Sequence, residues 1–279
     1  MFWFIINITI SDGCGTRTGS GKMKTKFNMP DWVPRLKPSQ KILITGATGG
    51  IGQALVKLLL HSDNCIVGAQ GNTSKVDWGD TRVLAIYNNF EEEGACQDVV
   101  TKFVEESGGI DALIILSGSI NFSGHWKNIS EPEWYREINQ NLSYPFFIAR
   151  EAMKEMEKTK GGGKIVLTGT ESSLHGGSDL SFPYAIAKRG TECLVQGLAR
   201  EGAPNNILVN GIRMGFIRSG FHQRWHKKSE EELRERAEMV PLKRGGDPNE
   251  VAAMITYLLS SYGDFITGQM LPITGGDWL

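Results

Sequence analysis

The sequence lacks the features that would place it in several large protein classes. Its four cysteines (Cys14, Cys65, Cys96 and Cys193) are scattered and form no C-x-x-C pair, which argues against a disulfide framework or a zinc site and favours reduced thiols in the cytoplasm. The 30 basic and 31 acidic residues nearly balance, so we expect no nucleic-acid partner and no strong attraction to a membrane surface. No run reaches the roughly 18 apolar residues that cross a bilayer.

The first 40 residues do not share the pattern of the rest of the chain. Residues 1–10 are apolar, but no basic residue precedes them and no small-x-small cleavage site follows, so a signal or membrane anchor is only a minor alternative. Residues 11–40 are rich in Gly, Lys, Thr, Ser and Pro without periodicity, which predicts that residues 1–40 are a flexible extension. The run 15–22 is not a P-loop, because five residues instead of four separate its glycines and Met23 follows its lysine.

From residue 41 onward, short apolar runs alternate with longer amphipathic stretches. Strands are predicted at 41–45, 65–69, 83–87, 112–116, 164–168, 207–212 and 269–272. Helices are predicted at 51–61, 91–106, 131–158, 184–201, 230–239 and 249–260. Repeated βα units without a second linker predict one domain, residues 41–279, with an α/β fold. We expect a Rossmann-type doubly wound parallel sheet of about seven strands with helices on both faces.

Four glycines (Gly46, Gly49, Gly50 and Gly52) lie directly between the first predicted strand and the first predicted helix. Glycine at such a place permits a tight turn and a close backbone approach, and the helix N-terminus then faces an anionic pyrophosphate. Glycine-rich turns also occur as plain structure. In the first βα unit of an alternating pattern, however, this turn predicts a dinucleotide site.

The end of the second predicted strand bears on the choice of dinucleotide. Folds that select NAD usually carry an acidic residue there for the ribose hydroxyls. Here the stretch 68–75 has no carboxylate, while Asn72, Ser74 and Lys75 offer hydrogen bonds to a 2′-phosphate. No arginine supplies a strong clamp. NADP(H) is therefore favoured slightly over NAD(H), and the alternative is that these polar residues form only a solvated turn.

A second motif lies far downstream of the glycine turn. Tyr184 and Lys188 are four residues apart in a predicted helix and therefore share one helical face. A cation beside a phenol favours the phenolate and lowers its pKa from about 10, so Tyr184 is predicted to exchange a proton with a carbonyl while a nicotinamide exchanges hydride. Alone, the pair is equally a core tyrosine with a long lysine beside it. Together with the glycine turn it becomes a catalytic candidate.

These motifs carry a resemblance to a known family. From about residue 41 to the C-terminus, the chain resembles single-domain short-chain dehydrogenases/reductases, the group that includes 3-oxoacyl-acyl-carrier-protein reductases and glucose dehydrogenases. The run 45–52 matches the family's T-G-x-x-x-G-I-G, although it also fits the T-G-x-x-G-x-x-G of longer epimerases and dehydratases. The short chain and the segments 241–252 and 266–276 favour the single-domain branch.

The resemblance implies four catalytic roles. Tyr184 matches the general acid/base, and Lys188 matches the residue that binds the nicotinamide ribose and depresses the tyrosine pKa. Asn141 matches the asparagine that holds a water in the proton relay. The hydroxyl that steadies the substrate carbonyl falls on Thr170, where the family usually has serine, and Ser172 is the alternative.

The resemblance also implies a set of cofactor contacts, with some departures from the family pattern. Asn-Asn-Ala-Gly after the fourth strand is replaced by 115–118, the aspartate that commonly meets adenine by Asn89, and Pro-Gly after the sixth strand by Met214-Gly215. The predicted cofactor-binding residues are Gly46, Thr48, Gly49, Gly50, Ile51, Gly52, Gln70, Asn89, Ser117, Gly118, Tyr184, Lys188, Gly215 and Ile217.

By resemblance, residues 215–241 form a lid over the substrate. The first part of this segment mixes basic and aromatic residues, which would suit an anionic substrate, but five glutamates follow within 230–238. An exposed, salt-bridged helix is therefore the favoured interpretation of the second part. His222 and His226 would share a helical face, yet no third ligand lies nearby, so we expect no metal.

The primary hypothesis is an NAD(P)(H)-dependent oxidoreductase that interconverts a carbonyl and a secondary alcohol of a small molecule by hydride transfer, with Tyr184 as general acid/base. The alternative is a non-catalytic dinucleotide-binding regulatory protein on the same fold. A membrane-tethered enzyme that uses residues 1–10 is a weaker third hypothesis. By resemblance, the long helices at 131–158 and 184–201 predict a homotetramer or homodimer.

Overall fold

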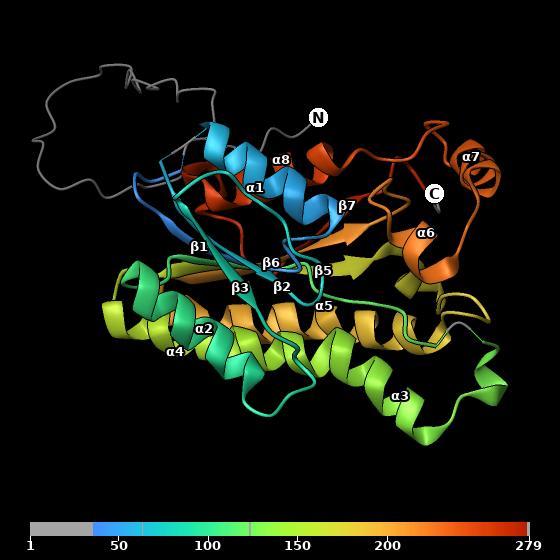
Figure 1. Ribbon diagram of the computed structural model, residues 1–279, viewed down its shortest axis with the longest axis horizontal. Helices are drawn as coiled ribbons and strands as arrows, with labels where there is room; N and C mark the ends of the chain where they lie inside the picture. The colour runs from blue at the N-terminus through green and yellow to red at the C-terminus, as the bar shows by residue number, and fades with distance from the viewer. Residues whose placement is uncertain (1–35, 63, 123, 278–279) are drawn as a thin grey trace, which may run out of the picture. The chain divides into compact units, whose positions relative to one another are not determined.

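The computed structural model describes residues 36–62, 64–122 and 124–277 (Figure 1). Its centre is one parallel sheet of seven strands in the order β3-β2-β1-β4-β5-β6-β7. The strands are β1 (Lys41–Thr45), β2 (Ile66–Gly71), β3 (Val83–Tyr87), β4 (Ala112–Ile115), β5 (Gly163–Thr170), β6 (Ile207–Met214) and β7 (Met270–Ile273). Every one overlaps its predicted range, and the predicted Rossmann-type doubly wound sheet is confirmed.

Helices cover both faces of this sheet (Figure 1). The helices are α1 (Gly50–Ser62), α2 (Ala95–Ser107), α3 (Glu131–Ile138), α4 (Tyr144–Thr159), α5 (Phe182–Gly202), α6 (Phe221–His226), α7 (Glu230–Met239) and α8 (Pro248–Leu259). On one face α1 packs against α8, and on the other α2 packs against α4 beside α5. In the described stretches, no helix is both long enough and apolar enough to span a membrane.

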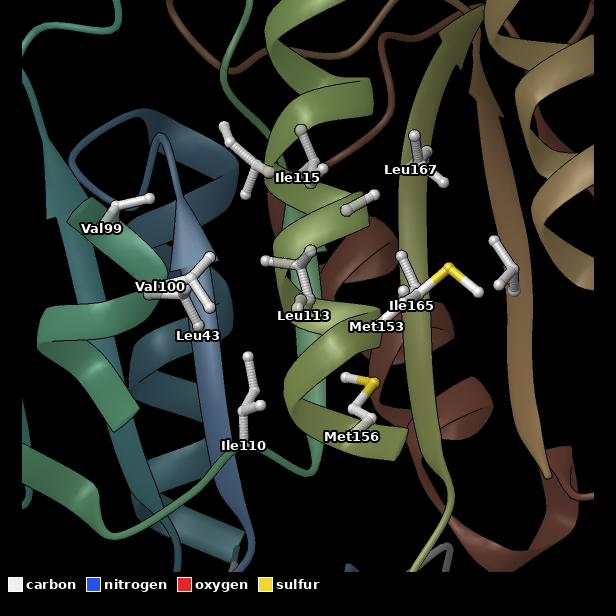
Figure 2. Close-up of a cluster of buried hydrophobic side chains, with 14 of the residues drawn as sticks. Leu43, Val99, Val100, Ile110, Leu113, Ile115, Met153, Met156, Ile165 and Leu167 are labelled. Carbon is white, nitrogen blue, oxygen red and sulfur yellow. The ribbon is translucent and has the colours of Figure 1, made fainter. Parts of the chain in front are cut away.

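The apolar strands supply side chains to both faces at once. In β1, Ile42 and Ile44 belong to the core beneath α1 and α8, whereas Leu43 between them belongs to the core beneath α2, α4 and α5. Figure 2 shows this second core, in which Leu43 of β1 lies beside Val100 of α2 and Leu113 of β4 stands between Leu43 and Met153 of α4. Each fully buried aliphatic side chain of this kind contributes about 1.5–3 kcal/mol to folding. Packing on both faces therefore fixes the carboxyl ends of the strands relative to the helices.

Most of the predicted N-terminal extension, including residues 1–10 and the run 15–22, lies outside the described residues. Its last part, 36–40, belongs to the fold. Leu36 is 5% exposed and packs in the core beneath α1 and α8, and the Ser39 N–H donates to the Asn64 carbonyl at 2.6 Å. Residues 36–40 therefore belong to the domain that was predicted to begin at residue 41, because burying the apolar Leu36 side chain stabilises the fold.

The helix predicted at 131–158 is interrupted. A π-turn at Asn139–Ser143 separates α3 from α4, and within it the Tyr144 N–H donates to the carbonyl of Asn139, five residues earlier. Pro145 follows at the start of α4 and has no N–H to donate to the Asn141 carbonyl four residues before it. The prediction of one continuous helix was wrong over this turn, and π-turns of this kind occur frequently at functional sites.

The topology places a crevice at one edge of the sheet. Strand β1 lies between β2 and β4, so the chain leaves β1 towards one face and β4 towards the other. In open α/β sheets, ligands bind at such a switch point, beyond the carboxyl ends of the strands. A cleft of 590 Å³ opens there.

Candidate active site

The glycine turn forms one wall of the cleft. Gly46 has φ +70°, and a Cβ at this position would lie 2.7 Å from the Ser117 backbone nitrogen. A Cβ on Gly52 would lie 2.5 Å from the Ala47 Cα. Neither position accepts a larger residue without movement of the backbone. Glycine at these two positions therefore allows the turn to pack closely against the residues after β4 and against the start of α1.

Gln70 supports this turn from behind. It is 2% exposed, and its Oε1 accepts the Gly46 N–H at 3.0 Å while its Nε2 donates to the Asn88 carbonyl at 3.1 Å. Both ends of the side-chain amide are therefore engaged inside the protein. Gln70 lies at the cleft as predicted, and its amide shapes the glycine turn.

Three exposed polar residues follow β2 and line the cleft: Asn72, Thr73 and Ser74. Thr73 was not singled out from the sequence. Lys75 is not among the lining residues. Its ammonium lies 5.9 Å from the centre of the Tyr87 ring, where a cation–π contact holds it. The prediction that Lys75 reaches the dinucleotide site therefore finds no support.

Tyr184 and Lys188 both line the cleft from one face of α5, as their spacing predicted. Lys188 is 4% exposed, and its Nζ donates to the Thr168 carbonyl at 3.0 Å and lies 5.8 Å from the centre of the Tyr184 ring. Strand β5 thereby fixes the lysine, and the lysine lies against the tyrosine.

The pKa values of this pair differ from the sequence-based expectation. Burial lowers the pKa of Lys188 to about 8. Burial also raises the pKa of Tyr184 above its usual value of 10.0, and the Glu137 carboxylate adds to the increase. The expectation that Lys188 lowers the pKa of Tyr184 was wrong for this structure, because burial disfavours the phenolate more than any neighbouring group favours it.

Two hydroxyl groups stand at the end of β5. Thr170 and Ser172 both line the cleft, and their Oγ atoms are 3.1 Å apart. The pair can share a hydrogen bond, so one hydroxyl can orient the other towards a ligand. The structure places both candidates for the carbonyl-binding role at the same site.

Asn141 is fully buried behind the cleft, within the π-turn. Its amide forms a two-point contact with the backbone of Ser119: Nδ2 donates to the carbonyl at 2.8 Å and Oδ1 accepts the N–H at 3.2 Å. A Cβ on Gly118 would lie 3.0 Å from Asn141 Oδ1 and 3.3 Å from Lys188 Nζ. Asn141 therefore lies close to the lysine, although its side chain does not line the cleft.

The predicted cofactor-binding residues all line this one cleft. Three contribute in distinct ways. The Ser117 and Thr45 hydroxyls are 2.9 Å apart, Asn89 Oδ1 accepts the Glu91 N–H at 3.2 Å, and Ile217 is buried in the core with 5% exposure. Ile217 can therefore offer a ligand little beyond its backbone.

Helix α6 forms the opposite wall of the cleft. The Phe221 ring centre lies 6.1 Å from that of Tyr184, and the imidazoles of His222 and His226 stack at 5.7 Å. Burial lowers the pKa of His222 to about 4 and also lowers that of His226, so both rings are neutral near pH 7. The described part of the chain holds no group of three His, Cys, Asp or Glu able to bind a metal. Helix α7 buries none of its residues, which confirms that the glutamates form an exposed helix.

The lining suits a dinucleotide. Backbone N–H groups at the first turn of α1 and the tight turn at Gly46 provide an anion site, and Gly46 admits no side chain that would fill it. The exposed polar residues after β2 and Tyr184 line the same cleft.

Comparisons with known proteins agree with this architecture. A family model described as Enoyl-(Acyl carrier protein) reductase matches residues 46–277. The chain is 31% identical over 248 residues to the 3-oxoacyl-[acyl-carrier-protein] reductase FabG of Thermotoga maritima, covering 84% of this chain and 96% of that one. It is 28% identical over 242 residues to human dehydrogenase/reductase SDR family member 4, covering 84% and 86%. The crystal structure of a short-chain alcohol dehydrogenase from Sinorhizobium meliloti 1021 is similar with a TM-score of 0.78 at 26% identity, covering 86% and 96%.

The chain belongs to the short-chain dehydrogenase/reductase family. Relatives are named as dehydrogenases or reductases, which supports an oxidoreductase, and members of the family generally use NAD(P)(H).

Sequence reasoning missed an ion-pair network next to Thr170 of this short-chain dehydrogenase/reductase. Arg213 of β6 pairs with Glu171, the residue after Thr170, at 2.7 Å, and with Glu192 of α5 at 3.6 Å. The three side chains are 10–18% exposed. The network joins β6, α5 and the residue that follows the end of β5. Nothing in the sequence pairs residues so far apart.

Replacing Arg213 with methionine is expected to destabilise the fold by about 3 kcal/mol, because the largely buried Glu171 carboxylate would lose its cation. Glu192 would keep its pair with Arg189 at 2.7 Å. Thermal or denaturant unfolding measures this loss. Arg200→Met is the matched control, since Arg200 pairs with Glu201 at 3.5 Å with both side chains largely exposed, and it should change stability by less than about 1 kcal/mol. Equal stability of the two variants would contradict a bracing role for the network.

Proposed function

We propose that this protein interconverts a carbonyl and a secondary alcohol with NAD(P)(H), using Tyr184 as general acid/base. The observation that carries the proposal is the single cleft that Tyr184, Lys188 and Thr170 share with the glycine turn. A proton-transferring group, a hydroxyl donor and a dinucleotide site then all reach the same substrate.

When bound, the nicotinamide supplies or accepts hydride at the carbonyl carbon. The glycine turn and the N-terminus of α1 hold the pyrophosphate. In the reductive direction Tyr184 gives its phenolic proton to the carbonyl oxygen, and in the oxidative direction it takes the proton from the alcohol. A hydrogen bond from Thr170 to the same oxygen stabilises the charge that develops there. The raised pKa of Tyr184 keeps the phenol protonated near neutral pH, which favours reduction.

Lys188 and Asn141 serve this proton transfer without touching the reacting bond. Lys188, fixed on the Thr168 carbonyl, provides a positive charge beside the tyrosine and a donor for the nicotinamide ribose. Pro145 leaves the Asn141 carbonyl without its ordinary helical donor, so this oxygen is suited to hold a water that returns the proton to Tyr184. These roles follow the family resemblance and the geometry supports them.

We also propose that the protein prefers NADP(H) to NAD(H), because the residues after β2 that line the cleft are uncharged hydrogen-bonding residues. Asn72→Asp is expected to raise the KM for NADPH about tenfold, through repulsion of a 2′-phosphate, and to change the KM for NADH little. Asn64→Asp is the matched control, because Asn64 is exposed and precedes the N-terminal end of β2. It should change neither the KM for NADPH nor the KM for NADH. Equal effects of Asn72→Asp on both cofactors would contradict the preference.

The proposal extends to assembly and location. Exposed apolar side chains stand on α4 and α5, among them Phe147 at 38% and Ile186 at 36%, and a homodimer or homotetramer through these helices would cover them. The scattered cysteines without a C-x-x-C pair support a cytoplasmic enzyme.

The direct test is consumption of NADPH and NADH with short ketones, sugars and β-ketoacyl thioesters. We expect turnover with at least one class, faster with NADPH. Tight binding of NADPH without turnover of any carbonyl or alcohol would instead support the non-catalytic regulatory protein.

A further inference from the structure

A buried carboxylate lies behind the cleft, and the proposed reaction gives it no role. Glu137 stands in the last turn of α3, is 1% exposed, and is the one buried residue of that helix, which the structure describes in full. Glutamate is almost never fully buried without partners. Its burial costs free energy, so the contacts that hold it there indicate what it does.

Within the described chain, the partners of Glu137 are N–H groups instead of a cation. Its Oε1 accepts the backbone N–H groups of Asn121 and Phe122, the latter at 2.7 Å. Its Oε2 accepts the Asn141 side-chain amide at 3.2 Å. A carboxylate that accepts three N–H donors is held in its ionised form, although burial raises its pKa above the usual 4.5.

These contacts join two parts of the site. Ser117, Gly118, Ser119, Ile120 and Asn121 line the cleft, and we call residues 117–122 the β4 segment. Glu137 bonds the far end of this segment, while Asn141 bonds its middle at Ser119. Because Glu137 also bonds Asn141, one carboxylate fixes the segment and the asparagine together.

The charge of Glu137 also acts on the proton-transfer pair. Helix α3 packs against α5, and the carboxylate raises the pKa of Tyr184 on α5, second to burial. The β4 segment carries no ionisable side chain. On α3 itself, Arg136 is paired with Glu91 at 2.9 Å and not with Glu137, and the Glu133 carboxylate accepts the Ser130 hydroxyl.

We propose that Glu137 is a positioning residue, which fixes the β4 segment to Asn141 and sets a negative charge near Tyr184. The inference rests on the proposed function. A negative charge disfavours the phenolate, so Glu137 holds Tyr184 in its proton-donating form and biases the enzyme towards carbonyl reduction.

The test compares Glu137→Gln with Glu131→Gln, which removes the same charge from an exposed position of the same helix. In Glu137→Gln, the new amide would face the Asn141 amide, donor against donor. We expect kcat for reduction to fall about tenfold with little change in the KM for NADPH. The pH profile of oxidation, which rises as Tyr184 loses its proton, should shift down by about one unit, and the amides of Asn121 and Phe122 should exchange hydrogen faster. Glu131→Gln should match the wild type in every measurement.

An unshifted pH profile in folded Glu137→Gln would overturn the proposal, since a purely structural role changes exchange and stability but not proton affinity. If Glu137→Gln fails to fold, Glu137→Asp carries the test. It should keep the wild-type pH profile because the charge is retained, and lower kcat because the shorter side chain draws back from the β4 segment. A shifted profile would overturn the proposal. If the wild-type protein shows no turnover, the proposed function is rejected. Amide hydrogen exchange in the variants would then be the measurement that tests whether Glu137 fixes the β4 segment.

Discussion

Tyr184→Phe is expected to lower kcat by about 10²- to 10⁴-fold, the usual contribution of a positioned general acid or base. This equals about 3–5 kcal/mol of transition-state stabilisation. The ring remains to pack beside Phe221, so the thermal unfolding temperature and the affinity for NADPH, measured by fluorescence titration, should stay close to those of the wild type. Only the hydroxyl group is removed.

Tyr135→Phe is the matched control for this change. Tyr135 lies on α3 with 60% exposure, and its substitution should leave turnover unchanged. Tyr184→Phe turnover within about twofold of the wild type would refute the assignment of the general acid. The pH dependence of the wild type tests the role of Lys188. Burial lowers the pKa of Lys188 to about 8, so its ammonium is charged below that pH and neutral above it. The rate of reduction should therefore fall as the pH rises through about 8.

Thr170→Ala is expected to lower kcat/KM by about 10²- to 10³-fold, the usual cost of removing one donor to a developing oxyanion. Ser172→Ala should cost less than about tenfold, since Ser172 acts through its hydrogen bond to Thr170 at 3.1 Å. Steady-state kinetics with any substrate that is turned over measures both.

Thr170→Ser separates the hydroxyl from the methyl group. It should keep most of the activity and accept bulkier carbonyl compounds, because the methyl group of threonine narrows the cleft. The reverse order, with Ser172→Ala the more damaging variant, would assign the carbonyl-binding role to Ser172.

Local pattern was enough to predict the fold. Strand β1 was predicted at its observed bounds because buried parallel strands read as apolar runs, and the glycine turn was found because its residues are adjacent in sequence. The break between α3 and α4 had one local signal, Pro145, whose missing N–H disfavours an unbroken helix. Leu36 was assigned to the extension because one apolar residue among polar ones carries no periodicity.

The electrostatics of the site could not be predicted in the same way. The spacing of Tyr184 and Lys188 correctly predicted that they share a face, but it led to the wrong direction for the pKa of Tyr184, because burial depends on elements far away in sequence. Glu137 resembled any surface glutamate of a charged helix. Its donors at Asn121 and Phe122 come from a separate segment, and only the folded chain brings them to it.

The π-turn between α3 and α4 has a consequence for how these helices are aimed. A π-turn holds one residue more than an α-turn, so the side chains of α3 and α4 are out of phase by about 100°. Helix α4 can therefore bury Ile148 and Met156 in the core, while α3 places Glu137 against the β4 segment behind the cleft. Deleting one residue from the turn would restore a single helical phase and rotate Glu137 away from its partners. The extra residue therefore allows α3 and α4 to direct their buried side chains differently although only the π-turn separates the two helices.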